Sequence, residues 1–146
     1  MFNEFFQEQW PLFLAVAVIV AMLVYSYFGD KLAGFKGVNT DEATRLYNDD
    51  AFVLDVRTAA EYKDGFIGNA VNVSVTDLPS TMSKLPADKE TPILVYCLSG
   101  GRSARAAGQM VKAGYTQVHN LSGGINAWKS AGLPLSSPKS KKNKKK

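Results

Sequence analysis

The longest hydrophobic run of the chain lies near its N-terminus. No charged residue occurs between Gln9 and Gly29, and the 19-residue stretch WPLFLAVAVIVAMLVYSYF inside this window is almost continuously apolar. A helix of that length spans about 29 Å, which matches the hydrocarbon core of a bilayer. The pattern therefore predicts one transmembrane helix over residues 10–29, preceded by a short N-terminal segment, residues 1–9.

Two features favour a retained membrane anchor over a cleavable signal peptide. Aromatic residues suited to membrane interfaces flank the run, with Trp10 at one end and Tyr25 and Tyr27 at the other. A signal peptide begins with a basic segment and has a shorter apolar region, whereas this N-terminus carries Glu4 and Glu8. A buried helix of a soluble domain is not favoured either, because the run offers no polar face.

Flanking charges predict the orientation of this helix. No Lys or Arg precedes the run, whereas Lys31 and Lys36 follow it and a lysine-rich tail lies farther on. Positively charged flanking segments tend to stay in the cytoplasm. We therefore expect a single-pass protein of the inner (cytoplasmic) membrane whose domain faces the cytoplasm, joined to the span by a short linker, residues 30–37.

From Val38 onward, strand patterns and helix patterns alternate. Strands are expected at residues 51–56, 70–75, 92–97 and 117–121, and helices at 41–50, 102–114 and 124–132, with a weaker helix at 77–85. Thr40 is the expected cap of the first helix, and Thr58 and Glu61 have the spacing of a capping box. Apolar strands separated by helices are typical of an α/β fold, a mostly parallel sheet with helices on both faces. Residues 38–135 form the expected domain.

The composition excludes several kinds of site. The 146 residues suffice for one domain with its own core. A single cysteine excludes an internal disulfide, a Cys-x-x-Cys redox pair and a cysteine-rich zinc site, and a free thiol suits a reducing compartment such as the cytosol.

The positive net charge belongs to the C-terminal tail. Six lysines lie in the last eight residues, KSKKNKKK, and without them the net charge of +4 becomes −2 for residues 1–138. The tail has no aromatic residue to stack on a base and no Arg to bind phosphate in two places, so a nucleic-acid partner is not expected. Residues 136–146 are expected to be a disordered lysine-rich tail, with weak adhesion to anionic lipid or RNA as the alternative.

The single cysteine, Cys97, ends the most apolar strand and directly precedes the turn LSGGRS. Ligands of parallel sheets bind beyond the carboxyl ends of the strands. Gly100 and Gly101 allow the backbone to curl, so that N–H groups at the start of the next helix can turn inward and lower the pKa of a thiol. The pattern predicts a nucleophilic thiolate; the alternative is a cysteine that only fills core space.

Three separated motifs resemble those of the rhodanese homology domain, the sulfurtransferase family. LDVRTAAEYKDGFIGNAVNV resembles its first signature, YCLSGGRS its active loop and LSGGINAW its closing motif, in the order and spacing of the family. The resemblance covers residues 38–135 and implies a rhodanese-like sheet. Together with the N-terminal span, the chain is similar to membrane-anchored bacterial rhodanese-like proteins.

The resemblance also implies a role for each motif. Cys97 would take a sulfane sulfur from a small donor, thiosulfate or a persulfide or polysulfide, and pass it from a persulfide to a thiol or cyanide-like acceptor. The active loop would hold the thiolate or persulfide through its backbone N–H groups, and it consists of Leu98, Ser99, Gly100, Gly101, Arg102 and Ser103. Asp55 and Arg57 would support this loop. No cofactor or metal is implied, and His119, the only histidine, is expected to pack.

Two positions depart from the family pattern. Phe66 stands where the family often has His, at a position that is usually structural. Leu98 stands where members that use thiosulfate often have a cation, and a leucine cannot bind a sulfonate oxygen. The departure disfavours thiosulfate and leaves a persulfide or polysulfide donor open.

Two other functions are alternatives to sulfur transfer. Related phosphatases and arsenate reductases place five residues between Cys and Arg, whereas four separate Cys97 from Arg102, which favours the smaller sulfur. A membrane-tethered adaptor with little or no catalysis, bound to a membrane-protein partner, would explain the anchor. The intact loop argues against it, because a module without chemistry has no need of the thiol.

Overall fold

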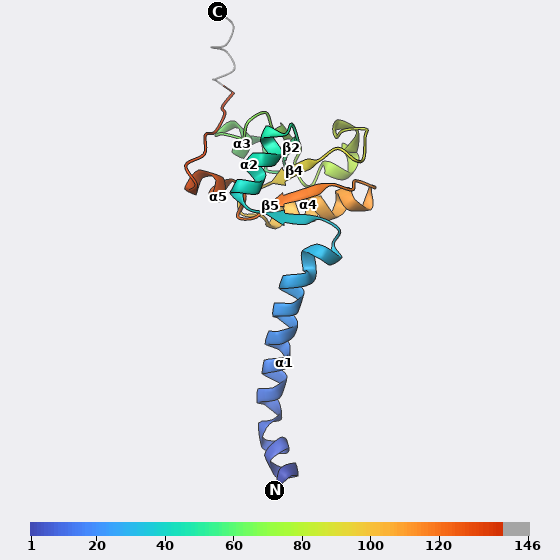
Figure 1. Cartoon of the computed structure of the whole chain (residues 1–146), viewed down its shortest axis with the longest axis vertical. Coiled ribbons are helices and arrows are strands. Elements are labelled where there is room, and N and C mark those ends of the chain that lie inside the picture. Colours follow the sequence, from blue (N-terminus) through green and yellow to red (C-terminus); the bar gives the residue numbers. More distant parts are fainter. Residues whose placement is uncertain (139–146) are drawn as a thin grey trace, which may run out of the picture. The chain divides into compact units, whose positions relative to one another are not determined.

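The computed structural model describes residues 1–138, apart from the side chains of Phe6, Asp30 and Lys31. Of the expected disordered tail, residues 136–146, the part 139–146 lies outside the described residues. The chain divides into two compact units, Met1–Ala33 and Gly34–Lys146, and each is described by itself (Figure 1).

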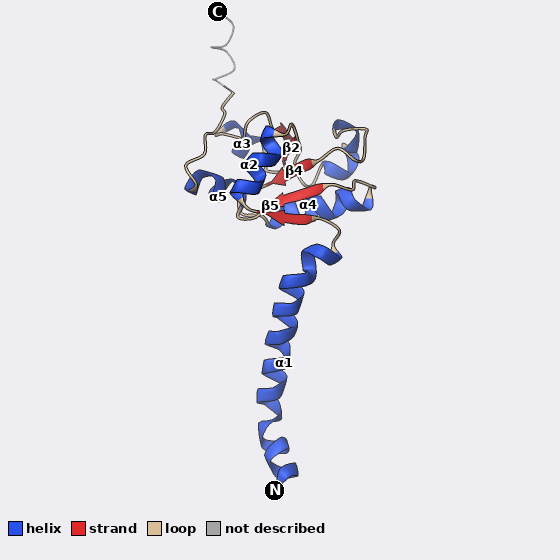
Figure 2. Cartoon of the chain, viewed as in Figure 1, coloured by secondary structure: helices blue, strands red, loops and turns tan. Residues whose placement is uncertain are grey.

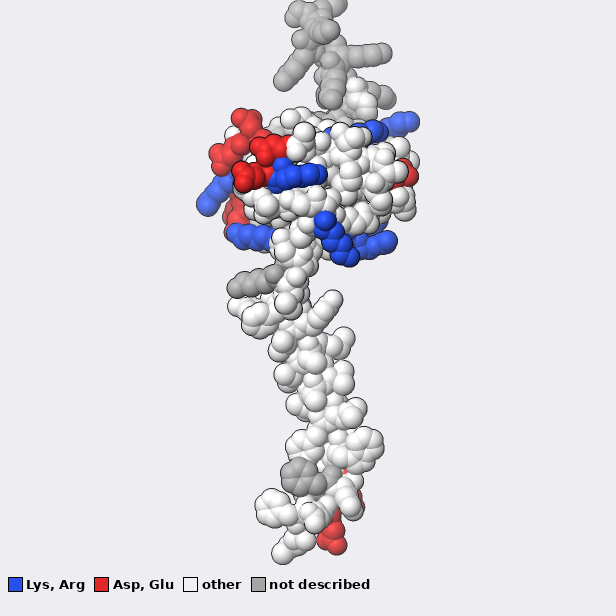
Figure 3. All heavy atoms as spheres, turned by 90° about the vertical axis from the view of Figure 1, so that its right-hand side faces the viewer, with Lys and Arg blue, Asp and Glu red and all other residues white. Residues whose placement is uncertain are grey.

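The first unit is one long helix, α1 (Phe2–Leu32). The helix begins before the expected span and includes most of the N-terminal segment assigned to residues 1–9. Its segment Gln7–Gly29 has a mean hydropathy of 2.3 and is not buried in the structure, so α1 is long and apolar enough to cross a membrane. Figure 3 shows a surface without charged side chains over most of this helix, with acidic side chains near its N-terminal end.

The second unit is built on a single sheet of five parallel strands (Figure 2). The strands are β1 (Lys36–Val38), β2 (Phe52–Asp55), β3 (Val71–Asn72), β4 (Ile93–Tyr96) and β5 (Val118–Leu121), in the order β1-β5-β4-β2-β3. All four residues of the central strand β4 are buried, as expected for a strand that is covered on both faces.

Helices cover both faces of this sheet, which confirms the expected α/β fold. They are α2 (Thr40–Asn48), α3 (Ala59–Lys63), α4 (Gly101–Lys112) and α5 (Gly124–Ser130). Side chains alternate along a strand, and one set, including Leu94 and Leu121, forms a core cluster with Ala43 of α2 and Trp128 of α5. The amphipathic helix α4 packs against β4 and β5 from the other face, through Ala106, Ala107 and Met110.

Three local expectations differ from the structure. Lys36 and Gly37, placed in the linker 30–37, form β1 with Val38, because β5 supplies the pairing that three residues cannot indicate by themselves. The cap of α2 is Asn39 rather than Thr40, in a capping box with Glu42.

The expected helix at 77–85 is instead two short 3-10 turns, η1 (Leu78–Ser80) and η2 (Met82–Lys84). The hydroxyls of Ser80 and Thr81 both donate to the carbonyl of Asp77, which offers the backbone an alternative to an α-helix.

The C-terminal end of the domain is hydrogen-bonded to the backbone of Phe66. Its backbone N–H donates to the Ser136 carbonyl at 2.9 Å, and the Ser136 N–H donates back at 2.7 Å, so contacts of the domain reach one residue into the segment assigned to the tail. The Phe66 ring is buried and stacks on Tyr62 at 4.2 Å between ring centroids. This position is therefore structural, as expected from the sequence.

Candidate active site

The thiol of Cys97 lies at the carboxyl edge of the sheet, directly after β4. Only 1% of the residue is exposed. In the register of the parallel sheet, Asp55 of β2 pairs with Tyr96, so the end of β2 lies beside Cys97 at the same edge. The chain then turns through the active loop and enters α4 at Gly101, close to the start that the sequence predicts.

Donors from the active loop converge on the sulfur. The N–H of Gly100 donates to Cys97 Sγ at 3.1 Å, and the Ser103 hydroxyl lies 3.4 Å from the same atom. Gly100 has a φ of +112°, in the left-handed region, which allows its N–H to point back at the preceding cysteine. The loop thus places donors around the thiol at the start of a helix.

These donors determine the ionisation of the thiol. Burial by itself raises the pKa of Cys97, because it penalises the thiolate. The Ser103 hydroxyl and the backbone N–H groups of Ser103, Gly100 and Ser99 favour the thiolate and outweigh burial, so that the pKa is lowered overall. The site therefore favours the nucleophilic form of the sulfur.

A buried asparagine of β5 joins this site. Ser103 Oγ lies 2.6 Å from Asn120 Oδ1 and 3.1 Å from the Gly100 carbonyl, and Asn120 Nδ2 donates to that carbonyl at 3.3 Å. Ser103 is fully buried, and Asn120 is 8% exposed. Asn120 thus connects β5 to both groups that contact the thiol.

The guanidinium of Arg102 is held by α3 rather than directed at the sulfur. Its two terminal nitrogens each donate to one carboxylate oxygen of Glu61, both at 2.9 Å. The hydrogen bond from Arg102 lowers the pKa of Glu61 to about 2, and Glu61 in turn raises the pKa of Arg102. Because Glu61 also completes the capping box at Thr58, one carboxylate ties the start of α3 to the start of α4.

Asp55 and Arg57 form a buried ion pair one step away from the thiol. The Arg57 guanidinium donates to both Asp55 oxygens at 2.7–3.1 Å and to the Gly65 carbonyl at 2.7 Å. The Tyr96 hydroxyl donates to Asp55 at 2.7 Å and accepts the Ile67 N–H at 3.0 Å. This pair is therefore linked by a hydrogen bond to Tyr96, the residue immediately before Cys97.

The N-terminus of α5 backs the active loop. The N–H groups of Ile125 and Asn126 donate to the carbonyls of Cys97 and Leu98, at 2.9 and 3.2 Å. Gly124, with a φ of +55°, lies so close that an added Cβ would be 2.5 Å from the Cys97 carbonyl oxygen. Only a glycine allows this approach. The Gly123–Gly124 pair and Trp128 of the closing motif thus have a packing role, and Gly124 packs against the active loop itself.

The mouth of the site, by which we mean the exposed position directly after Cys97, is apolar. The Leu98 side chain, directly after the buried cysteine, is 40% exposed. The two cations of the predicted site are each paired with a carboxylate, Arg57 with Asp55 and Arg102 with Glu61. Neither of these two cations is therefore unpaired.

The predicted residues thus form one continuous arrangement. Gly100 and Ser103 contact Cys97 directly, the other loop residues lie between or beside them in the sequence, and Asp55 is hydrogen-bonded to Tyr96, the residue before Cys97. Asn120 and Tyr96 did not stand out in the sequence, and Glu61 was expected only in a helix cap. The capping-box carboxylate three residues into a helix was the available signal for Glu61; a lone asparagine in a strand gave none.

The remaining candidates lie apart from the thiol. The Nδ1 atom of His119 is buried without a hydrogen-bond partner among residues 1–138, and burial followed by the charge of Lys36 lowers the pKa of this residue. Within that described range, no group of His, Cys, Asp and Glu has the makings of a metal site.

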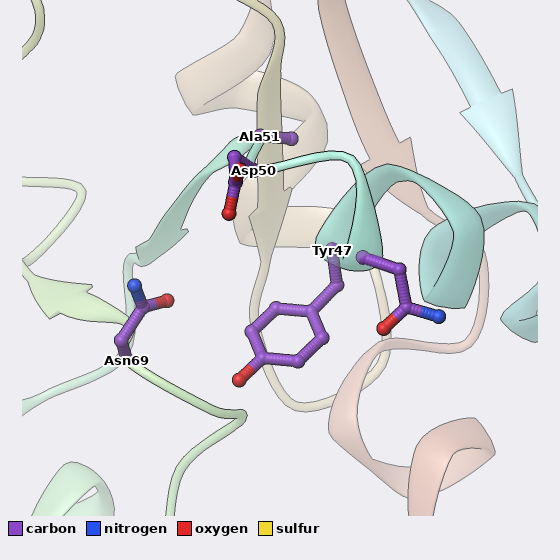
Figure 4. Close-up of a pocket in the computed structure, with 5 residues that line it drawn as sticks. Tyr47, Asp50, Ala51 and Asn69 are labelled. Carbon is purple, nitrogen blue, oxygen red and sulfur yellow. The ribbon is translucent and has the colours of Figure 1, made fainter.

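A polar hollow of about 430 Å³ lies at the opposite edge of the sheet. It is lined by Tyr47, Asn48, Asp50, Ala51 and Asn69, which precede β2 and β3 (Figure 4). Since Cys97 follows a parallel strand, the hollow and the thiol belong to different ends of the domain. None of the predicted site residues lines it.

Comparison with known proteins shows the family to which the domain belongs. A family model described as a rhodanese-like domain matches residues 39–131. A sulfurtransferase of Allochromatium vinosum is 39% identical over 90 residues, which cover 62% of this chain and 82% of that protein. Thiosulfate sulfurtransferase GlpE of Coxiella burnetii is 36% identical over 96 residues, covering 65% and 88%.

Two further matches concern the helix and the fold. The uncharacterized protein YibN of Escherichia coli is 32% identical over 122 residues, covering 85% of that protein and 82% of this chain, which is more than Gly34–Lys146 and so extends into α1. A crystal structure of a rhodanese-related protein from Thermoplasma volcanium superposes with a TM-score of 0.61 at 31% identity, covering 70% of this chain and 98% of the other.

Proposed function

Because this chain belongs to the rhodanese-like sulfurtransferase family, we propose that it moves a sulfane sulfur through a persulfide on Cys97. The observation that carries this proposal is the convergence of the Gly100 N–H and the Ser103 hydroxyl on a buried thiol whose pKa they lower. A cysteine that only filled core space would have no need of such donors.

In the loading step, the Cys97 thiolate attacks the outer sulfur of a donor. For a persulfide donor R–S–S⁻, a new bond forms between Cys97 Sγ and that sulfur, the donor's S–S bond breaks, and R–S⁻ leaves with the electron pair. The lowered pKa increases the fraction of Cys97 that is present as the nucleophilic thiolate. The donor's sulfur reaches the enzyme without any external oxidant or reductant.

In the discharge step, an acceptor thiolate attacks the outer sulfur of the enzyme persulfide. The bond between Sγ and the outer sulfur breaks, its electron pair returns to Sγ, and the acceptor leaves as a persulfide. The Gly100 N–H and the Ser103 hydroxyl stabilise the thiolate that is regenerated. The chain has a single cysteine, so the acceptor thiol must come from another molecule.

We propose a persulfide or polysulfide as the preferred donor rather than thiosulfate. Thiosulfate carries a sulfonate whose oxygens need cations or further donors, whereas Leu98 presents an apolar side chain at the mouth. Arg102 is neutralised by two hydrogen bonds to Glu61. A donor that brings little charge beyond the transferred sulfur fits this mouth better.

We further propose that α1 anchors this domain to the inner membrane as a single pass, with the domain in the cytoplasm. The support is the apolar segment Gln7–Gly29, and similarity to YibN that extends into α1. The proposed organisation keeps the span at 10–29 and a domain that begins with β1 at Lys36. A membrane-embedded donor or acceptor protein would explain the tether.

The deciding experiment compares the full chain with a Cys97→Ser variant. Each is incubated in detergent with polysulfide or thiosulfate, its intact mass is measured, and sulfur transfer to cyanide is assayed. The wild-type chain should gain the mass of one sulfur atom and the variant none, because a serine oxygen cannot form a persulfide. Since the two side chains are close in volume, thermal unfolding should change little. Failure of Cys97 to accept sulfur from either donor would leave the adaptor as the better function.

A further inference from the structure

The Ser103 hydroxyl has more acceptors within reach than it has protons. Its oxygen lies 2.6 Å from Asn120 Oδ1, 3.1 Å from the Gly100 carbonyl oxygen and 3.4 Å from Cys97 Sγ. A serine hydroxyl carries one proton and can donate it to one of these atoms at a time. Which acceptor receives the proton must therefore depend on the state of the sulfur.

Asn120 Oδ1 and Cys97 Sγ are the two acceptors that compete for the Ser103 proton. The Gly100 carbonyl already accepts the Ala104 N–H at 3.1 Å and Asn120 Nδ2 at 3.3 Å. That second bond also fixes the orientation of the Asn120 amide, with Nδ2 toward Gly100 and Oδ1 toward Ser103. Asn120 is 8% exposed, so turning the Ser103 proton away would leave a buried carbonyl oxygen without this donor.

The sulfur passes through three states in the proposed function, on which this inference rests. In the neutral thiol and in the persulfide, Sγ carries no full charge, and the Ser103 proton can stay on Asn120. In the thiolate, Sγ is an anion, and a hydrogen bond from Ser103 stabilises this state of the sulfur more than the other two. For the thiolate to receive the Ser103 proton, the 2.6 Å bond between Ser103 and Asn120 has to break.

We propose that Asn120 is a positioning residue that competes with Cys97 Sγ for the Ser103 proton and so prolongs the life of the enzyme persulfide. Discharge sends the electron pair of the broken S–S bond to Sγ, and a less stabilised leaving thiolate departs more slowly. Asn120 thus raises the activation free energy of that departure, although it contacts neither the sulfur donor nor the sulfur acceptor. The site thereby holds its sulfur until a reactive acceptor thiol arrives.

The charges around the thiol do not change when Asn120 is replaced by an apolar residue. Arg102 of α4, whose pKa is raised by its hydrogen bond to Glu61 of α3 and less by the charge of Cys97, stays paired with Glu61. At the end of β2, Asp55 stays paired with Arg57. An effect of an Asn120→Leu variant on the ionisation of Cys97 would therefore come through hydrogen bonds.

The test measures the pH dependence of Cys97 alkylation by iodoacetamide in the full chain in detergent, where one cysteine gives one signal. Asn120→Leu should lower the midpoint by about half to one pH unit, because the freed hydroxyl can donate to the thiolate. A purely structural role predicts the opposite sign, since losing the bond from Nδ2 to Gly100 would loosen the Gly100 N–H from the sulfur. Asn120→Ala serves as a second variant if the leucine variant does not fold.

The control is the same substitution in a Ser103→Ala background. Ser103→Ala alone should raise the midpoint, because the thiolate loses a donor. Adding Asn120→Leu should then produce no further fall, since the hydroxyl through which Asn120 acts is gone. A fall of the same size in both backgrounds, or an unchanged or raised midpoint in the single Asn120 variant, would overturn the proposal.

A second readout follows the persulfide itself. After loading with polysulfide and removal of excess donor, the Asn120→Leu persulfide should react with glutathione about three- to tenfold faster than the wild-type persulfide, in line with a better leaving thiolate. An equal or slower rate would overturn the storage role. If wild-type Cys97 takes up no sulfur at all, the proposed function fails, while the alkylation midpoints still decide whether Asn120 competes for the proton.

Discussion

At the scale of single residues, the site depends on hydrogen-bond donors more than on unpaired charge. The sulfur is contacted by a backbone N–H and a serine hydroxyl, while Arg57 and Arg102 each satisfy a carboxylate. Donors of this kind stabilise a small anion such as a thiolate or a terminal persulfide sulfur. They offer little to the oxygens of a larger sulfonate, which makes the donor preference testable at Leu98.

Leu98→Arg should improve the use of thiosulfate relative to polysulfide. A guanidinium at this exposed mouth position would add an ion-assisted hydrogen bond to a sulfonate oxygen, worth about 1 kcal/mol after solvent screening, or roughly fivefold in kcat/KM. The measurement is transfer to cyanide from each donor. Leu98→Met is the matched control, because it keeps an apolar side chain; an equal gain in both variants would show that charge is not the reason.

The ion pair between Glu61 and Arg102 should make stability depend on pH. The folded-state pKa of Glu61 is lowered to about 2 from 4.5, so its stabilising contribution is present above pH 4.5 and is lost as the pH falls toward 2. Glu61→Gln should lower the free energy of unfolding by about 1–2 kcal/mol near pH 7, and the difference from wild type should shrink between pH 4.5 and 2.

Thermal unfolding of the full chain in detergent at pH 7 and pH 3 measures this difference. Glu42→Gln is the matched control, since Glu42 holds the same place in the capping box of α2 but makes a single, exposed contact with Lys36 at 3.5 Å. A loss in the Glu61 variant that is no larger than in the Glu42 variant would mean that only the cap matters.

At the scale of elements, two helices determine the conformation of the active loop. α4 begins within the loop and carries Ser103, while the N-terminus of α5 donates to the carbonyls of Cys97 and Leu98 from behind. These bonds satisfy carbonyls that would otherwise compete with the N–H groups turned toward the sulfur. The loop therefore depends on a close approach that only Gly124 permits.

Gly124→Ala should both destabilise the domain and impair sulfur transfer. Its Cβ would lie 2.5–2.6 Å from backbone atoms of Cys97 and Leu98, at a φ of +55° that alanine adopts poorly. We expect a loss of about 2–4 kcal/mol in unfolding free energy. Gly108→Ala in α4 is the control, because an added Cβ there meets nothing within 4 Å and should stabilise the helix by about 0.5–1 kcal/mol. Full activity in the Gly124 variant would contradict the role given to α5.

At the scale of the whole molecule, the chain combines an apolar helix with a domain whose charges are largely on its surface. α1 has no buried segment over Gln7–Gly29, and such an apolar surface is unstable in water. A bilayer would cover it and would keep the domain near membrane-bound partners. We therefore predict a single-pass topology.

Protease added to intact spheroplasts should leave the domain whole, and disruption of the membrane should expose it to digestion. We expect this orientation because the flanking lysines follow the span rather than precede it. Immunoblotting for the domain measures the outcome, with a known periplasmic protein as the digestion control. Digestion in intact spheroplasts would reverse the orientation, and recovery in the soluble fraction would remove the anchor.

Most of the framework was determined by local sequence. Continuous apolarity from Trp10 to Phe28 indicates a helix, and the βα alternation after Val38 indicates a parallel sheet, because both follow from short-range periodicity. The place of Cys97 at a strand end before Gly100 and Gly101 likewise indicates the active loop. The linker boundary was wrong because β1 needs β5 as its partner before it can be recognised.

Only the tertiary structure decided how the polar side chains are paired. Ser103 meets Asn120, Arg102 meets Glu61, and Tyr96 meets Asp55, in each case between different elements of the chain. Periodicity gives the face on which a residue lies but not the partner that its hydrogen bonds will reach across the fold. The register of the sheet and the close approach at Gly124 bring these groups to one edge, where they set the ionisation of a single sulfur.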